Sequence, residues 1–358
     1  MFKLCLCGVI IMLKPLGSPA TLLRRRELSH RELNRHLGSQ PGLISSIIEK
    51  GVARHYHKKT ILSGNRFMRR SHDLQKMREI LEPQDDLKEI QRAISRVLSR
   101  YFVPHEIAHA YVKNRGIVTN ATRHIGARSM LHIDLADFFG SITQEAVLNG
   151  LYHVLEDFYA SDIETIAELC CYDGFLPQGS PASPILSNLV CFPLDMELSE
   201  LARSFGCALT RYSDDIVFST ATRSLPSKLA RVSDREAAYT VKLGQPLRSL
   251  FELHGFELNM KKLRFQRWPG PLKVTGVLVG ERLHVPREFR HNIGAALSQW
   301  KRHGIVVAAR NHPKGSAEAF AGSLKGCIDH VGHVEGRDST HYRRLLIDLE
   351  TLIARDLN

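Results

Sequence analysis

The feature that most constrains this chain is a pair of adjacent acids between two apolar β-runs. Residues 208–212 and 216–218 have the composition of strands, and Asp214 and Asp215 stand in the short segment between them. We predict a strand, a tight turn and a second strand over 207–219. Adjacent strand residues point to opposite faces, but a tight turn presents both carboxylates near one rim.

A third acid has the same placement at the end of another apolar strand. Residues 129–135 alternate between apolar and polar side chains, and Asp134 comes near their end. Pairing of the two segments would gather three acids, which repel one another and lose hydration. A divalent cation removes both problems, and hard oxygen ligands select Mg²⁺ or Mn²⁺. Such a cluster fits two-metal phosphoryl transfer, whereas each acid taken alone also fits a turn former or a cap.

The rest of the chain mixes helices and strands. Apolar residues recur at helical spacing over 85–101, which predicts an amphipathic helix. A loop rich in Gly, Pro and Ser over 174–184 leads into a predicted helix that begins near Ser183, with proline in its first turn. A hairpin is predicted over 272–285, and the tail from residue 290 is predicted to be mainly helical. These elements indicate an α+β or mixed α/β fold.

Composition narrows the class of partner. Hydrophobic residues make up 43% and charged residues 24% of the chain, which excludes a disordered or fibrous protein. The 49 basic and 37 acidic residues give a net charge of 49 − 37 = +12, which favours a polyanionic partner. Residues 21–60 are predicted to be helical and basic, either as a solvated face or as a contact to a nucleic-acid backbone. The seven cysteines form no C-x-x-C pair, so neither a zinc ribbon nor a disulfide framework is expected.

The N-terminus allows three interpretations. Lys3 precedes an apolar run over 4–13, as in a signal peptide, but translation from Met12 or a buried helix explains the run equally. It is too short to cross a bilayer as a helix. We expect no membrane association.

Seven short motifs occur in one order along the chain. They are Arg78-Glu79-Ile80 with Pro83, Asn120-Ala121-Thr122-Arg123-His124, Leu131 to Phe139, Pro177 to Pro184 with Ser187-Asn188, Tyr212-Ser213-Asp214-Asp215, Gly255-Phe256 with Leu258-Asn259 and Lys262, and Val274-Thr275-Gly276. In this order the chain resembles reverse transcriptases, and within them the bacterial retron enzymes. The resemblance covers about residues 75 to 330. It departs from the family at Ser71, where a basic residue is usual and for which Lys76 would substitute.

The resemblance implies a right-hand polymerase fold with fingers, palm and thumb. We expect an N-terminal basic helical extension at 1–70, fingers at 71–128, a palm at 129–290 and a helical thumb at 291–358. Within the palm we expect a nucleotide-pocket loop at 174–188, the catalytic hairpin at 207–219 and a primer-grip hairpin at 272–285.

The resemblance also implies roles for individual residues. Asp134, Asp214 and Asp215 would be catalytic and, with the Leu135 carbonyl, would hold two Mg²⁺ ions, with Mn²⁺ as the alternative. The incoming nucleotide would meet Arg78, Phe139, Gln178, Gly179 and Lys262. RNA or primer would meet Asn120, His124, Val274, Thr275, Gly276, Lys325, Arg343 and Arg344. Phe138 is expected in the core, and Asn120 and His124 have a second candidate role, bracing the fingers against the palm.

The function implied is that of a retron RNA-directed DNA polymerase in the bacterial cytoplasm. Its template would be a structured noncoding RNA whose internal 2′-OH serves as primer, and its product would be single-stranded DNA joined to RNA. Partners would be that RNA, its DNA product, dNTPs and a separate effector protein in antiphage defence. The alternatives are a group II intron-like or abortive-infection reverse transcriptase, and a scaffold that binds RNA without synthesis.

Overall fold

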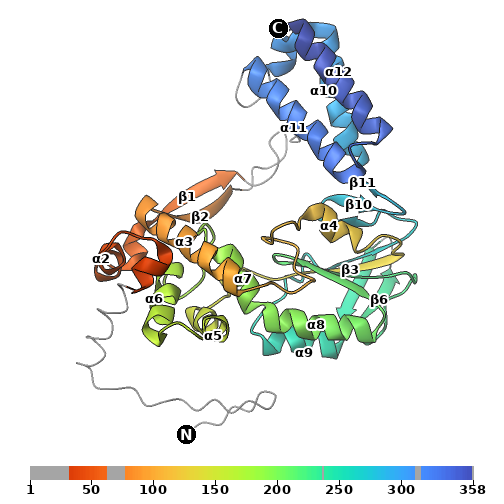
Figure 1. Ribbon diagram of the computed structural model, residues 1–358. Helices are drawn as coiled ribbons and strands as arrows, with labels where there is room; N and C mark the ends of the chain where they lie inside the picture. The colour runs from red at the N-terminus through yellow and green to blue at the C-terminus, as the bar shows by residue number, and fades with distance from the viewer. Residues whose placement is uncertain (1–31, 63–76, 236–237, 311–315, 357–358) are drawn as a thin grey trace, which may run out of the picture.

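The structure is a computed structural model that describes residues 32–62, 77–235, 238–310 and 316–356. Figure 1 shows a helical body carrying a hairpin, a sheet-containing body beside it, and a helical bundle that contains the C-terminal helix. All strand pairs among the named strands of the described residues are antiparallel. The predicted α+β class is confirmed.

A four-stranded sheet forms the centre of the second body. Its order is β4-β5-β3-β8, and the bounds are β3 (Ser129–Asp134), β4 (Ala208–Tyr212), β5 (Asp215–Thr220) and β8 (Arg264–Arg267). The predicted strand over 129–135 and the predicted hairpin over 207–219 are therefore confirmed. Every residue of β3 is buried, because β5 and β8 flank it and helices cover both faces of the sheet.

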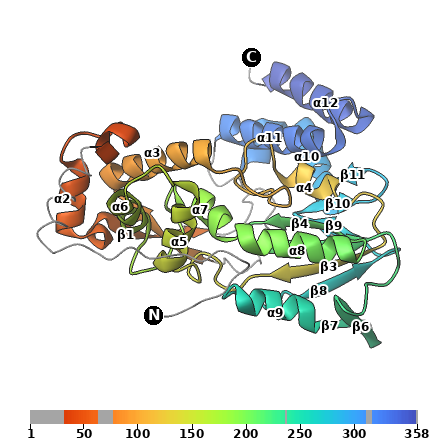
Figure 2. The ribbon, with the colours of Figure 1, turned by 60° about the horizontal axis from the view of Figure 1, so that its bottom comes forward.

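Helices cover the two faces of this sheet. In Figure 1, α8 (Phe192–Ser204) and α9 (Gln245–Leu253) lie below it and α4 (Ile117–Thr122) lies above it. The helix predicted from Ser183 is α7 (Ser183–Val190), with a proline in its first turn. A second hairpin, β6 (Ala230–Arg235) and β7 (Ala238–Leu243), lies beside β8 and was not predicted (Figure 2).

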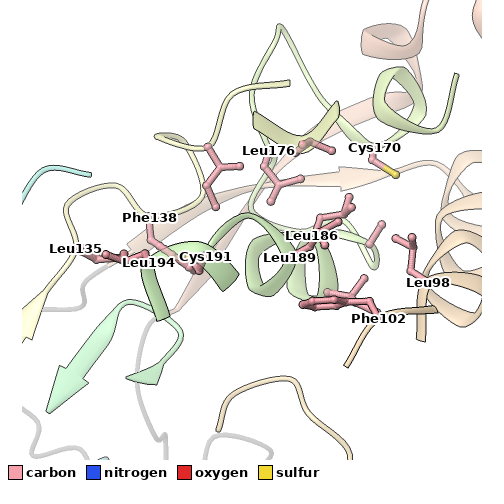
Figure 3. Close-up of a cluster of buried hydrophobic side chains, with 14 of the residues drawn as sticks. Leu98, Phe102, Leu135, Phe138, Cys170, Leu176, Leu186, Leu189, Cys191 and Leu194 are labelled. Carbon is pink, nitrogen blue, oxygen red and sulfur yellow. The ribbon is translucent and has the colours of Figure 1, made fainter. Parts of the chain in front are cut away.

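The helical body packs around the predicted helix α3 (Asp85–Tyr101). Around it lie α2 (Leu43–Lys50), the 3₁₀ turn η1 (Val52–His55), α5 (Gln144–Val154) and α6 (Ala160–Cys170). Figure 3 shows Leu98 and Phe102 beside the α7 residues Leu186 and Leu189. One continuous hydrophobic core therefore joins this body to the central sheet.

A two-stranded hairpin replaces part of the predicted N-terminal helical region. β1 (Tyr56–Leu62) pairs with β2 (Met77–Pro83), from Tyr56 opposite Pro83 to Leu62 opposite Met77. The helical prediction for residues 56–60 is thus wrong, because this segment satisfies its backbone hydrogen bonds through a partner strand. Residues 32–37 and 43–50 are helical as predicted. Residues 21–31, Ser71 and Lys76 lie outside the described residues.

The C-terminal part has its own core. The predicted hairpin over 272–285 is a three-stranded unit of β9 (Lys273–Val274), β10 (Val277–Val279) and β11 (Leu283–His284). The helices α10 (Arg287–Ala309), α11 (Ala317–Glu335) and α12 (Thr340–Asp356) follow, so the tail is helical as predicted. Trp300, Ile328 and Leu349 form part of the second hydrophobic cluster. Of the helices that the structure describes, none has the length and apolar content that a bilayer crossing requires.

Candidate active site

The three predicted catalytic acids meet at one end of the central sheet. Asp134 ends β3 and lies directly opposite Asp215, the first residue of β5. The backbone N–H of Leu135 donates to the Asp214 carbonyl at 3.0 Å, which fixes the turn against the end of β3. The strand pairing predicted from apolar alternation therefore brings residues about 80 positions apart in sequence to one rim.

The three acids carry more negative charge than the one nearby ammonium group, that of Lys262, offsets. Burial raises the pKa of Asp214 above its ordinary value, and the nearby carboxylates of Asp134 and Asp215 add to that increase. Its own backbone hydrogen bond and the Lys262 ammonium oppose the increase. Clustered carboxylates of this kind are stabilised by an added cation, so the site fits a divalent metal electrostatically.

Lys262 supplies the cation that faces Asp134 in this structure. Its Nζ donates to Oδ1 and Oδ2 of Asp134 at 3.0 and 2.8 Å. Within the part of the chain described, no three His, Cys, Asp or Glu side chains converge closely enough to enclose a metal. The predicted metal ligands are therefore carboxylates at one rim of the sheet, and in this structure Lys262 neutralises part of their charge.

Leu135, whose carbonyl is the predicted backbone ligand, directly follows Asp134 in the chain. Leu135 forms an antiparallel bridge with Leu258, but the bridge's two hydrogen bonds use the Asp134 carbonyl and the Ala136 N–H. The Leu135 carbonyl takes part in neither of them. The metal contact of the Leu135 carbonyl therefore remains a prediction.

A buried ion pair supports the catalytic turn from behind, and the sequence did not reveal it. Arg211 and Asp195 are both 0% exposed and form a bidentate pair at 2.6 Å for each contact. The same guanidinium donates to the Ser213 carbonyl at 3.2 Å and to Oδ1 of Asn188 at 3.0 Å. Its only sequence signal was a charged residue inside an apolar strand. Arg211 therefore connects α7 and α8 to the turn that carries Asp214.

Two aromatic rings lie beside the turn. Phe138 is 5% exposed and belongs to the core, as predicted. Phe139 is half-buried, with its ring centroid 5.2 Å from that of Phe138 and 6.4 Å from that of Tyr111. The Tyr111 hydroxyl lies 3.3 Å from Oγ of Ser213. Tyr111, which the sequence did not single out, thus joins Phe139 in bordering the turn.

The predicted nucleotide-pocket loop packs against β2. Gly179 has a φ of 134°, and a Cβ there would collide with the Leu81 carbonyl oxygen. The Gln178 carbonyl accepts the Leu81 N–H at 2.9 Å, and Ser180 Oγ donates to buried Gln91 at 2.8 Å. The loop is therefore attached to the β1–β2 hairpin and to α3.

Arg78 stands on the same strand β2, opposite Ile61. Its side chain lies outside the described part of the structure. The predicted contact of Arg78 with a triphosphate therefore remains a prediction.

The predicted RNA contacts of Asn120 and His124 are wrong, because each residue is only 1% exposed. Nδ2 of Asn120 donates to Oγ1 of Thr275 at 3.3 Å. The two ring nitrogens of His124 contact Ser219 Oγ at 2.7 Å and Thr210 Oγ1 at 2.8 Å. Burial lowers the pKa of His124 to about 3. Both residues brace the palm from inside, which agrees with the bracing role.

The predicted primer-grip residues divide between core and surface. Val274 is 0% exposed and its side chain packs in the second core, so its predicted role in the primer grip remains a prediction that would have to act through the backbone. Thr275 and Gly276 have φ of 45° and 86° and form the turn between β9 and β10. Of the three predicted residues, Gly276 is exposed and Thr275 is half-buried.

The three predicted RNA contacts of the thumb lie on α11 and α12. All three, Lys325, Arg343 and Arg344, are exposed. Lys325 pairs with Asp329 at 3.0 Å, and Arg343 pairs with Asp338 at 2.6 Å. Exposed pairs of this kind are weak, so a phosphate would compete with these aspartates.

Comparison with known proteins supplies the family context. A family model described as "Reverse transcriptase (RNA-dependent DNA polymerase)" matches residues 57–279. The chain is 32% identical over 223 residues to the retron Ec86 reverse transcriptase of Escherichia coli, covering 62% of this chain and 65% of that protein. It is 34% identical over 249 residues to the retron Mx65 reverse transcriptase of Myxococcus xanthus, covering 65% and 55%. Identity to the retron Mx162 reverse transcriptase of the same organism is 32% over 248 residues, covering 63% and 50%. The matches span between half and two thirds of these relatives' lengths.

Proposed function

The chain belongs to the reverse transcriptase family and is of the retron type, and we propose that it is an RNA-directed DNA polymerase. Family membership confirms the predicted right-hand polymerase fold. The observation that carries the proposed activity is the convergence of Asp134, Asp214 and Asp215 at one end of the central sheet.

The proposed chemistry assigns a task to each group around the acids. Asp134, Asp214, Asp215 and the Leu135 carbonyl would hold two Mg²⁺ ions, or Mn²⁺, as the oxygen donors suit a hard cation. When bound, such ions activate an attacking hydroxyl and neutralise charge on a triphosphate. Lys262 would neutralise the leaving pyrophosphate once a metal has taken over the charge of Asp134.

The groups that border the turn would select and hold the nucleotide. The half-buried ring of Phe139 would collide with a ribose 2′-OH and so favour deoxynucleotides. Gln178 and Gly179 would border the incoming base from a loop attached to β2. Arg78 would grip the triphosphate, because a guanidinium binds phosphate bidentately.

The proposed substrates follow from the three relatives named above, all of which are retron reverse transcriptases. The template would be a structured noncoding RNA whose internal 2′-OH is the primer, and the product RNA-linked single-stranded DNA. A role in antiphage defence with a separate effector protein belongs to the same proposal. The turn at Thr275 and Gly276 and the thumb residues Lys325, Arg343 and Arg344 would contact RNA or primer.

The test compares a variant that removes the charge of two catalytic acids with a control variant that removes the charge of a nearby acid outside the proposed site. The double variant Asp214→Asn, Asp215→Asn should lose extension of an annealed primer with dNTPs and Mg²⁺, while its affinity for RNA persists. Asp137→Asn removes an exposed acid of the same motif and should leave extension within a few-fold. Extension by the double variant at the wild-type rate would refute the catalytic assignment.

A second measurement tests the substrate. Nucleic acid that copurifies with the protein from its host should contain RNA joined to DNA by a branch at a 2′-OH. Recovery of unbranched RNA of many sequences would refute the retron priming mechanism and leave the polymerase assignment standing.

A further inference from the structure

A hollow of about 560 Å³ lies at the end of the central sheet away from the acids. It is lined by Arg223, by Tyr239 of β7, by Phe265 and Arg267 of β8, and by Trp268 in the loop that follows β8. Figure 2 shows β6 and β7 beside β8 at this edge of the sheet. We call it the Trp268 hollow. Its volume is in the range of sites that hold small molecules or single nucleotides.

Two aromatic side chains are exposed at the hollow. Trp268 is 50% exposed and Tyr239 is 37% exposed, although indole and phenol rings are normally largely buried. The Trp268 backbone N–H donates to the Arg128 carbonyl at 2.9 Å, and Tyr239 packs edge-on against Phe265 at 5.1 Å. The Trp268 backbone and the Tyr239 ring are therefore held in place, while part of both side chains faces solvent.

Three guanidinium groups lie over these rings. Arg128 and Arg223 stand 5.3 and 5.5 Å from the centroid of Trp268, and Arg267 stands 5.2 Å from that of Tyr239. Among the described residues, neither Arg128 nor Arg223 forms an ion pair with a carboxylate. A guanidinium stacked on a ring keeps its in-plane N–H groups available for a phosphate.

The hollow is separate from the candidate active site. Arg267 pairs with Ser129 at one end of β3, and Asp134 stands at the other end. Five residues at about 3.3 Å each place the two ends roughly 17 Å apart. A ligand in the hollow would therefore leave the acids free for a primer end and a nucleotide.

We propose that the Trp268 hollow binds an unpaired stretch of nucleic acid, the base against Trp268 and Tyr239 and the phosphates on Arg128 and Arg223. Exposed aromatic rings interleaved with arginine match the way proteins hold single strands. A protein partner would favour an apolar hollow with little charge, whereas Arg223 and Arg267 line this one and Arg128 lies over its tryptophan ring. The inference rests on the proposed function, because it supplies the enzyme with a second grip on its RNA or on the DNA made from it.

Intrinsic fluorescence offers a direct test, because the chain has two tryptophans and the other, Trp300, is 0% exposed. Titration of the full-length protein with unlabelled single-stranded 12-mers of RNA and of DNA should quench the emission. Trp268→Phe, which leaves only Trp300, should show no quenching. The oligomer that binds with the higher affinity identifies whether the hollow binds RNA or DNA. Quenching that persists in Trp268→Phe, or equal affinity for a free mononucleotide, would overturn the proposal.

A second pair of variants tests the phosphate contacts without touching the rings. Arg128→Gln with Arg223→Gln should weaken binding of the preferred 12-mer and lower the slope of log affinity against log salt by about 1.4, at 0.7 per phosphate contact. Trp268→Ala should weaken it roughly 5- to 150-fold. Unchanged affinity in all these variants would overturn the inference.

Failure of this inference is distinguishable from failure of the proposed function. Extension of a short annealed primer–template needs the acids and not the hollow, so all hollow variants should retain it. If the hollow variants bind normally and still extend, only the inference fails. If the wild type binds single strands but extends nothing, only the proposed polymerase activity fails.

Discussion

The ammonium group of Lys262 lies between the two carboxylate oxygens of Asp134, at 3.0 and 2.8 Å. The lysine side chain is 50% exposed and the aspartate side chain 12% exposed, so water screens the pair and its contribution to stability is at most about 1 kcal/mol. Its importance is therefore positional. A metal ion at the acids and a triphosphate beside them would compete for the two partners of this one contact.

Replacement of Lys262 should show separately how this lysine affects metal binding at the acids and DNA synthesis. Without metal, Lys262→Met should lower the unfolding temperature. Addition of Mg²⁺ should then raise the unfolding temperature of this variant more than that of the wild type, because the ion no longer competes with the ammonium group for Asp134. DNA synthesis at saturating dNTP should fall about 100-fold, the usual cost of removing one positioned group that stabilises developing negative charge. Lys261→Met removes the same charge from the exposed neighbour and should change neither quantity appreciably. Equal behaviour of the two variants in thermal melts and primer extension would contradict the role given to Lys262.

The ion pair behind the catalytic turn should be essential for stability. Arg211→Met leaves the fully buried carboxylate of Asp195 without its partner, which costs about 3–5 kcal/mol. Arg203→Met, on the exposed surface of α8, should change the free energy of unfolding by less than about 0.5 kcal/mol. Urea denaturation measures both. A loss of similar size in the two variants would show that Arg211 does not hold the turn.

The glycine of the nucleotide-pocket loop should tolerate no side chain. In Gly179→Ala the new methyl group meets the Leu81 carbonyl in a backbone conformation with φ of 134°. We expect a loss of about 1–3 kcal/mol in unfolding free energy and a higher KM for dNTPs. Gly174→Ala has φ of 82° but no atom within 4 Å of the added Cβ, so it tests backbone strain alone. If Gly174→Ala proves as damaging in both measurements, the contact with β2 is not the cause.

Stability should depend on pH through His124. Burial lowers its pKa to about 3 in the folded protein, against about 6.5 in the unfolded chain. The unfolded state therefore binds the proton more readily, and the His124 contribution is complete above pH 6.5 and decreases as the pH falls toward 3. The decrease amounts to about 1.4 kcal/mol per pH unit in this range.

The variant His124→Gln isolates this contribution. Its unfolding free energy should fall less steeply between pH 6.5 and 4.5 than that of the wild type, although it is lower at pH 7. His109, whose pKa burial lowers to about 4, gives both proteins a residual slope in the same direction. Parallel pH profiles from chemical denaturation would mean that His124 is protonated in the folded protein.

Three strands of the central sheet, β3, β4 and β5, were predictable because their information is local, whereas β8 was not predicted. Apolar alternation over 129–135 and the acidic turn at 213–215 determine two strands and their acidic ends, and pairing then follows from burial of the apolar face. The helix over 85–101 follows from periodicity in the same way. By contrast, β1 has polar and basic residues at most positions, and it is a strand only because β2 pairs with it.

Residues whose partners lie far along the chain were missed or misassigned. Arginine is usually a surface residue, and Arg211 can be buried only because Asp195 of α8 pairs with it. Asn120 and His124 belong to a motif that also fits an exposed RNA contact. Their burial arises from the sheet strands and the β9–β10 turn that close over them. Sequence order alone does not specify such closure.

The contact between Asn120 and Thr275 limits how related enzymes can be recombined. The thumb helices share one core with β9–β11, and that core also includes Ala121 of α4 and Met130 of β3. In a chimaera joined at residue 290, the helical bundle of a related enzyme would have to pack against the β9–β11 unit of this chain, whose side chains fit a different bundle. Residues 272–356 and 117–124 would therefore have to be exchanged together, and the exchanged pieces would still have to fit Met130 and Val217 of the central sheet.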